Sequence, residues 1–350
     1  MAKGLASGIG SHIIPKFYLD RFADPPDREG GQKQIWVYEK GRKPRYTATG
    51  VQGFQNGYFA FTKDDGTLDE SLETRLAELE GNCLETLELT ATPFFDIQSA
   101  SRRNDLALYA SMLFCRATQR RNRSEKTYAN LRQQFVDLLA DDEWLDRVTA
   151  HYVERTGDTI RPKVLKDRIA IFAERMNDTM ELRNSFVEDL IQTTEILKNV
   201  ALQKPWQLLR APKGAEFVTS DNPFITFIDL GNGRLNSGHG LRKKETIGVF
   251  PIAPQVCLVM GTEGPDEVTT DAASVTLINN TIIELCERYV YSKTLSEGVR
   301  QVVDKMANER KYGVNAFVPL GIKVPTAKDF VLHFLKLAPW PFPNWMTQTR

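Results

Sequence analysis

The sequence predicts an α+β fold, in which a helical central block packs against a mostly antiparallel sheet. Short strand-like runs come first, and apolar residues then recur at helical spacing as far as the break at Lys204-Pro205. Alternating apolar runs separated by turns return after this break. Strands, then a long helical block, then antiparallel-looking strands are typical of α+β proteins rather than of a doubly wound parallel sheet.

The first elements in the chain are two strands joined by a turn. Residues 34–38 alternate polar and apolar side chains, residues 41–44 have the composition of a turn, and residues 45–49 are expected to form the partner strand.

The central block begins with the helix that the sequence predicts most clearly. Thr67 and Glu70 resemble a capping box, and leucines at helical spacing follow, which predicts a helix over 69–89. The same periodicity predicts further helices over 104–123, 126–139, 143–155 and 164–199.

Strand signals dominate after residue 204. Residues 206–210 and 215–219 flank a Pro-Lys-Gly turn, which predicts a hairpin. More strands are expected over 224–228, 248–252, 255–260 and 288–291, and helices over 270–287 and 296–311.

The composition is that of a globular protein. Of the 350 residues, 41% are hydrophobic and 26% are charged, which provides ample apolar material for a core. We expect one large α+β domain over residues 1–350, with subdivision into a helix-rich part (1–203) and a sheet-containing part (204–350) as the alternative.

Charge and cysteine usage restrict the class of protein. Lys plus Arg and Asp plus Glu both total 45, so a purely electrostatic nucleic-acid coat protein is not expected. The four cysteines form no CxxC pair, which indicates reduced thiols. No signal peptide and no apolar run of membrane-spanning length are present, so we expect a soluble cytoplasmic protein without a membrane partner.

The segment Ser220-Asp221-Asn222-Pro223 is the first candidate for chemistry. It follows a predicted strand, and proline fixes the chain direction immediately after it. Asp221 is a candidate general base that orients water, and Asn222 a candidate ligand for a substrate carbonyl or amide. The structural alternative is that both side chains bond the local backbone of a turn.

A second candidate is the segment around His12 near the start of the chain. Histidine titrates near neutrality and can act as acid, base or ligand. Phe17 and Tyr18 follow it and could stack on a nucleic-acid base. The alternative is that His12 is a hydrogen-bonded core residue and that the aromatic residues anchor the core.

Two glutamates share one face of the helix predicted over 69–89. Glu73 and Glu80 are seven residues apart, and we rank Glu80 higher because Gly81 follows it. If this face turns toward His12 or Asp221, the carboxylates could activate water as in hydrolases. The alternative is that both are solvated helix residues.

A basic stripe covers residues 102–132, with eight Lys or Arg residues against two acidic ones. Arg116, Arg120 and Arg123 have the i, i+4, i+7 spacing of a single helical face. Such a row suits the phosphate oxygens of nucleic acid. A solvated face paired with acidic residues explains the stripe equally well.

Metal and cofactor signatures are not found in the sequence. The four histidines lack HxxxH or HExxH spacing, and neither GxGxxG after a strand nor a P-loop occurs. We therefore expect no metal site and no cofactor, although a Mg²⁺ site made by Glu80 and Asp221 remains an alternative.

The motif HxxPxFYLxxF over residues 12–22 and the Ser-Asp-Asn-Pro motif over 220–223 resemble a bacterial family classed as a domain of unknown function. Further matching features occur in the family's order, so the resemblance covers most of the chain. Members are often encoded near phage-defence genes, and the resemblance therefore implies a role in antiviral defence.

The resemblance and the basic stripe together lead to three hypotheses for function. The first is a metal-independent DNA glycosylase that excises modified bases, with DNA as the partner. In that hypothesis Asp221 or Glu80 activates water, and Asn222 and His12 read an extruded base. The alternatives are a Mg²⁺-dependent nuclease and a non-enzymatic phage sensor or ligand-binding protein.

Overall fold

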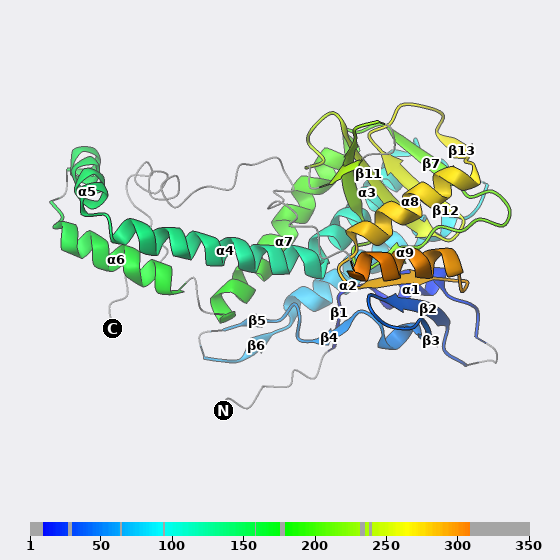
Figure 1. Cartoon of the computed structure of the whole chain (residues 1–350), viewed down its shortest axis with the longest axis horizontal. Helices are drawn as coiled ribbons and strands as arrows, with labels where there is room; N and C mark the ends of the chain where they lie inside the picture. Colours follow the sequence, from blue (N-terminus) through cyan, green and yellow to red (C-terminus); the bar gives the residue numbers. More distant parts are fainter. Residues whose placement is uncertain are drawn as a thin grey trace. The chain divides into compact units, whose positions relative to one another are not determined.

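The computed structural model describes residues 10–26, 30–63, 65–93, 95–157, 159–175, 179–231, 235–237 and 240–308 (Figure 1). These residues form two compact units. The first unit contains those of 10–121 and 187–308, and the second contains those of 122–186. The first unit thus takes residues from both sides of position 203, where the sequence suggested a subdivision. None of the helices in the described ranges is long and apolar enough to cross a membrane.

The main sheet of the first unit has six strands in the order β10-β9-β11-β12-β7-β13. Neighbouring strands are antiparallel except for β13, which runs parallel to β7. All residues of β12 are buried, as expected for a strand covered on both faces. The strands are β7 (Trp206–Arg210), β9 (Ile225–Asp229), β10 (Leu235–Ser237), β11 (Thr246–Ala253), β12 (Val256–Met260) and β13 (Glu267–Thr269).

A four-stranded sheet with the order β3-β2-β14-β8 joins the start of the chain to its later part. The predicted hairpin of β2 and β3 is present, and β14 pairs with the other side of β2. The strands are β2 (Gln34–Glu39), β3 (Arg45–Ala48), β8 (Thr219–Ser220) and β14 (Tyr289–Ser292). The two remaining pairs are β1 (Gly10–His12) with β4 (Phe54–Asn56) and β5 (Phe61–Thr62) with β6 (Leu68–Asp69).

The predicted hairpin over 206–219 is wrong. Strand β7 pairs with β12 and β13, whereas β8 pairs with β14 in the other sheet. The turn at Gly214 instead carries the chain from one sheet to the other.

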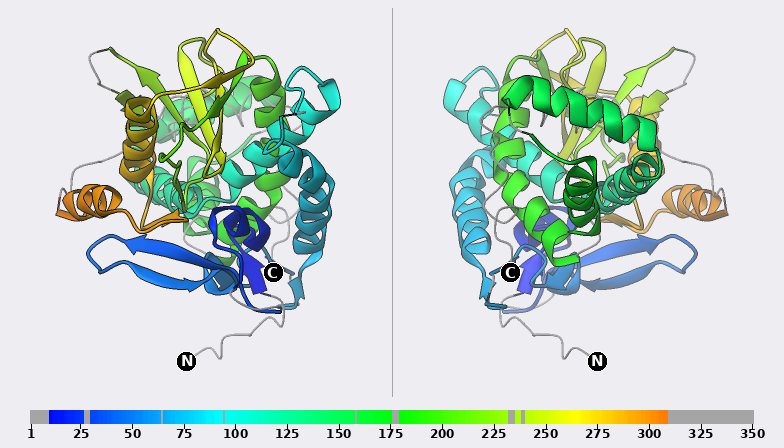
Figure 2. Two further views of the ribbon diagram at one scale, coloured as in Figure 1. Left: turned by 90° about the vertical axis from the view of Figure 1, so that its right-hand side faces the viewer. Right: turned by 90° about the vertical axis from the view of Figure 1, so that its left-hand side faces the viewer.

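Helices cover both faces of the main sheet. Residues of α8 and α9 share one apolar cluster with residues of β9, β11 and β12. On the other face, the ring of Phe114 in α3 packs edge-on against Phe224 at 5.8 Å. Both figures show α9 beside the hairpin of β2 and β3 (Figures 1 and 2). The helices of this unit include α1 (Lys16–Leu19), α2 (Ser71–Leu89), α3 (Ala100–Arg116), α8 (Ala272–Leu285) and α9 (Glu297–Asn308), with 3-10 turns η1 (Asp20–Phe22) and η2 (Thr49–Val51).

The second unit has its own core between α4, α5 and α6. Phe135, Trp144 and Leu165 are central to it. The Asp141 side chain caps the start of α5 by accepting a hydrogen bond from the Trp144 N–H, and Gly157 ends this helix in the left-handed conformation. The helices are α4 (Thr118–Leu139), α5 (Asp142–Thr156), α6 (Pro162–Arg175) and α7 (Thr179–Leu202), of which α4 and α7 have residues in both units.

The helix predicted over 104–123 is interrupted at Ala117. This residue has φ −54° and ψ 134°, an extended conformation that ends α3 before α4 begins. Arg116 is therefore in a different helix from Arg120 and Arg123, and the predicted single arginine face does not exist.

Candidate functional site

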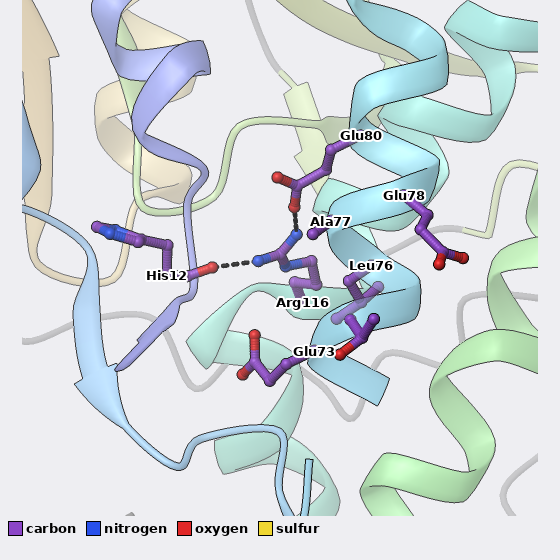
Figure 3. Close-up of a pocket in the computed structure, with 8 residues that line it drawn as sticks. His12, Glu73, Leu76, Ala77, Glu78, Glu80 and Arg116 are labelled. Carbon is purple, nitrogen blue, oxygen red and sulfur yellow. Dashed lines mark hydrogen bonds and ion pairs between the residues drawn. The ribbon is translucent and has the colours of Figure 1, made fainter. Parts of the chain in front are cut away.

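A pocket of about 620 Å³ lies beside helix α2 in the first unit (Figure 3). Strand β1 contributes His12 and helix α3 contributes its last residue, Arg116. The pocket thus contains Glu80 and the backbone of His12, two of the predicted site residues, together with Arg116. The lining residues from α2 are Glu73, Thr74, Leu76, Ala77, Glu78 and Glu80.

Arg116 connects the three segments that form the pocket. Its side chain is only 2% exposed. One terminal nitrogen forms an ion pair with a Glu80 carboxylate oxygen, and the other donates to the backbone carbonyl of His12 (Figure 3). Its guanidinium also lies 5.0 Å from the centre of the Phe59 ring. Arg116 was predicted to bind nucleic-acid backbone, but a buried guanidinium with these partners instead holds Glu80 in position.

Glu73 is the second carboxyl group of the pocket. It lies two helical turns before Glu80, and Figure 3 shows the two carboxyl groups on either side of Arg116. Burial raises the pKa of Glu73, although the Ser11 hydroxyl and the Arg116 guanidinium act in the opposite direction. Glu73 therefore retains its proton to higher pH than an exposed glutamate.

The imidazole of His12 extends away from Arg116, Glu73 and Glu80 (Figure 3). Its ring packs edge-on against Phe54 at 5.3 Å. Burial lowers the pKa of His12, although a hydrogen bond with the Gln52 backbone opposes this. His12 thus supplies its backbone carbonyl to the interior of the pocket, and its ring lies toward the exposed side chain of Phe54.

Asp221 lies outside the pocket lining and is buried. Its carboxylate accepts three backbone hydrogen bonds, from the N–H groups of Glu287 (2.9 Å), Arg288 (2.6 Å) and Tyr289 (2.9 Å). Burial raises its pKa to about 6, although these three hydrogen bonds lower it. In this arrangement Asp221 fixes the turn that leads into β14, which matches the structural alternative weighed for it.

Asn222 is also buried and has protein partners. Its amide nitrogen donates to the Gln119 side chain at 3.1 Å and to the Leu285 carbonyl at 3.2 Å. The Ser220 hydroxyl accepts from the Asn222 N–H at 3.1 Å. The Ser-Asp-Asn-Pro motif therefore joins β8, α4 and the end of α8.

The other predicted nucleic-acid contacts are placed as follows. Tyr18 is fully buried, and its hydroxyl donates to the Pro251 carbonyl at 2.6 Å and lies 2.8 Å from the Thr219 hydroxyl. Phe17 is half-buried against the Tyr109 ring. Arg120 is half-buried, with its guanidinium 5.8 Å from the Phe114 ring centre. Arg123 lies in α4, and its side chain is outside the described residues.

Sequence reasoning underestimated two residues of the pocket. Glu73 was ranked below Glu80, although its spacing of seven from Glu80 was the available signal. Arg116 was assigned to a surface row, and nothing in its local sequence indicates that it would be buried. No group of three or more His, Cys, Asp or Glu side chains suited to a metal ion occurs within the described parts of the chain.

Comparison with known proteins identifies the family of the chain. A family model described as "Protein of unknown function (DUF4238)" matches residues 11–296, which include both motifs noted in the sequence. Searches of curated proteins and of solved structures found no match.

Proposed function

The chain belongs to the family of proteins of unknown function DUF4238, and we propose that it is a metal-independent hydrolase that cleaves the N-glycosidic bond of a base in DNA. The observation that supports this proposal is the pair of unlike carboxyl groups in one pocket. Burial raises the pKa of Glu73, whereas Glu80 is ion-paired with the buried Arg116. Two carboxyl groups in contrasting environments can divide acid and base roles between them.

Each group has a defined part in the proposed reaction. Glu73 donates its proton to the leaving base, and the electron pair of the bond between C1′ and the base nitrogen goes to the base. Water adds to C1′ and transfers a proton to Glu80, which also stabilises the positive charge that develops on the sugar. Arg116 is a positioning residue that orients Glu80 through their ion pair.

The dimensions of the pocket are consistent with this proposal. Seven residues of helix place the Cα atoms of Glu73 and Glu80 about 10 Å apart along the helix axis, which leaves room for a sugar and a water molecule. A volume of about 620 Å³ lies within the range of pockets that bind small molecules. In duplex DNA the base would have to be extruded, which favours modified or weakly paired bases. In the predicted antiviral role, the protein would excise such bases from phage DNA.

The test is base excision in the presence of EDTA. Purified protein is incubated with duplexes that contain one uracil or one 5-hydroxymethyluracil, and abasic sites are revealed by alkali. We expect Glu73→Gln and Glu80→Gln each to lower the excision rate by about 10²-fold or more. The matched control is Glu85→Gln, an exposed glutamate on the same helix that does not line the pocket, and its rate should be unchanged.

Two outcomes would contradict the proposal. Excision at the same rate in Glu73→Gln, with the fold confirmed by circular dichroism, would exclude Glu73 as the proton donor. Strand cleavage that appears only when Mg²⁺ is restored would favour the nuclease, and intact DNA under both conditions would favour a sensor.

A further inference from the structure

Three arginines surround one buried glutamate at the hairpin of β2 and β3. Glu39, at the end of β2, is only 3% exposed, whereas Arg42, Arg45 and Arg288 are 66%, 41% and 54% exposed. Arg42 lies in the turn of the hairpin, Arg45 begins β3, and Arg288 precedes β14 on the other side of β2. We call Arg42, Arg45 and Arg288 the arginine cluster.

Glu39 neutralises only part of the charge of this cluster. Its carboxylate lies 2.5 Å from Arg288 Nη2, 2.9 Å from Arg45 Nη1 and 3.2 Å from Arg42 Nε. With Lys40 and Lys43 in the same turn, five positive groups lie near the three carboxyl groups of Glu39, Asp221 and Glu287, which leaves a local excess of positive charge. Arg42 meets Glu39 through Nε, and its terminal N–H groups have no partner among the residues that the structure describes. A guanidinium with free N–H groups is suited to bind phosphate in a bidentate manner.

The surroundings of the arginine cluster increase its positive charge. Residues 40–45 contain four basic residues and no acidic one, and Lys43 among them is exposed. Figure 2 shows the hairpin of β2 and β3, in blue, at the edge of its unit beside α9. This placement leaves the turn accessible to a large partner.

Two of the arginines lie near one aromatic ring. The Arg288 guanidinium is 4.9 Å from the centre of the Tyr289 ring, and the Arg45 guanidinium is 5.8 Å from it. Tyr289 is partly exposed. Positive charge combined with an aromatic ring is the arrangement with which proteins bind single-stranded nucleic acid, because phosphates meet the arginines and a base stacks on the ring.

The Ser-Asp-Asn-Pro motif fixes this side of the arginine cluster. Asp221 accepts hydrogen bonds from the backbone N–H groups of both Arg288 and Tyr289. Hydrogen bonds to a buried carboxylate hold the backbone of this segment in place, so its ordering adds less to the entropic cost of binding a ligand.

We propose that the arginine cluster and Tyr289 form a binding site for the phosphates and one base of single-stranded DNA. This proposal rests on the proposed function, because DNA is chosen as the ligand on that ground. The arginine cluster would be the surface that holds the strand. The pocket itself is unsuited to phosphates, because three of its lining residues are glutamates, Arg116 is already paired with Glu80, and the His12 ring extends away from them. Backbone phosphates therefore need a separate basic surface.

Gln52 connects the arginine cluster to the pocket. Its side-chain oxygen accepts a hydrogen bond from Arg45 at 3.2 Å, and its backbone is hydrogen-bonded to the side chain of His12. The His12 carbonyl in turn accepts from Arg116. The two surfaces are thus linked by consecutive contacts within one unit.

The experiment measures fluorescence anisotropy of a labelled 16-nucleotide oligothymidylate at several salt concentrations. Arg42→Ala is the main variant, because Glu39 retains Arg45 and Arg288 as partners and the fold should persist. We expect it to weaken binding several-fold at low salt and to reduce the slope of log K against log salt concentration by about one. Tyr289→Ala should weaken binding without changing this slope.

The matched control is Arg147→Ala, which removes the same charge from an exposed arginine paired with Glu143 in the second unit. It should bind like the native protein. Binding and excision are measured separately: oligothymidylate binding that depends on Arg42, without base excision by the native protein, would contradict the hydrolase proposal alone. No binding by the native protein, or equal binding by Arg42→Ala, would overturn the DNA site. Competition by inorganic polyphosphate at equal phosphate concentration would show a general polyanion site instead.

Discussion

The Asp221 carboxylate holds the Arg288 backbone in place, with Oδ2 2.6 Å from the amide nitrogen. Asp221 lies in the Ser-Asp-Asn-Pro motif and Arg288 lies 67 residues later, next to β14. Two segments that are remote in sequence are therefore joined by a buried carboxylate. The motif therefore holds the backbone that carries Arg288, one of the three residues of the arginine cluster.

Asp221→Ala is expected to destabilise the protein strongly. The substitution removes a buried carboxyl group and leaves three partly buried backbone N–H groups without this acceptor, which costs about 3 kcal/mol of the free energy of unfolding. Urea denaturation measures this loss. Asp304→Ala, at a surface ion pair with Arg300, should change stability by about 0.5 kcal/mol or less. Equal effects of the two substitutions would mean that the three hydrogen bonds contribute little.

Asp221 also predicts how stability depends on pH. Its pKa is about 6 in the folded protein because burial disfavours the charge, and it is about 3.9 in an unfolded chain. Between these values the folded state binds more protons, so the free energy of unfolding falls as pH rises from about 4 to about 6, by about 3 kcal/mol.

The measurement for this prediction is urea denaturation at several pH values with native protein and Asp221→Asn. The difference between the two isolates Asp221, because Glu73 acts in the same direction and Glu39, whose pKa is lowered, acts in the opposite one. The Asn variant should lack the part of the slope that Asp221 contributes. Parallel curves for both proteins would contradict the prediction.

Tyr18→Phe is expected to lower stability without affecting DNA binding. The variant loses a fully buried hydroxyl that donates to the Pro251 carbonyl and lies beside the Thr219 hydroxyl, which costs about 1–3 kcal/mol. Thermal unfolding measures the loss, and Tyr46→Phe at the surface is the control, with a smaller effect. Weaker binding of oligothymidylate by a folded Tyr18→Phe would restore the original expectation that this residue contacts DNA.

Arg116→Met is expected to move the pH profile of excision. The Arg116 charge lowers the pKa of Glu73, so its removal raises that pKa further. Because Glu73 must be protonated to act as an acid, the alkaline limb of kcat/KM should shift to higher pH. Arg116→Lys keeps a positive charge and should keep the limb nearer its native position. If the alkaline limb of Arg116→Met lies at the same pH as that of the native protein and of Arg116→Lys, the limb reports a group other than Glu73.

The general architecture could be predicted from the sequence because it depends on local periodicity. Leucines at helical spacing gave helix α2 within two residues of its observed start, and the α+β class followed from the order of the elements. The end of α3 at Ala117 could not be predicted, because the surrounding sequence contains no glycine or proline and remains compatible with helix.

The candidate site was only partly predictable for a different reason. Glu80 and His12 were singled out by residue type, and they do line one pocket. The burial of Arg116 depends on a carboxylate from α2 and a carbonyl from β1, two partners that are remote in sequence. The placement of Asp221 likewise depends on N–H groups more than 60 residues away. Contacts of this kind arise from tertiary packing, which a single sequence does not display.

The N-terminal aromatic motif has a consequence for the order of folding. Tyr18 and Arg21 find their partners at Pro251 and Ile252, which follow them by 233 and 231 residues. A chain made from its N-terminus exposes Tyr18 and Phe22 until strand β11 has been synthesised. This segment is synthesised more than 200 residues before the strand that buries it, and such long-range closure slows folding. Truncation before β11 would leave these aromatic side chains without a core and prone to aggregation.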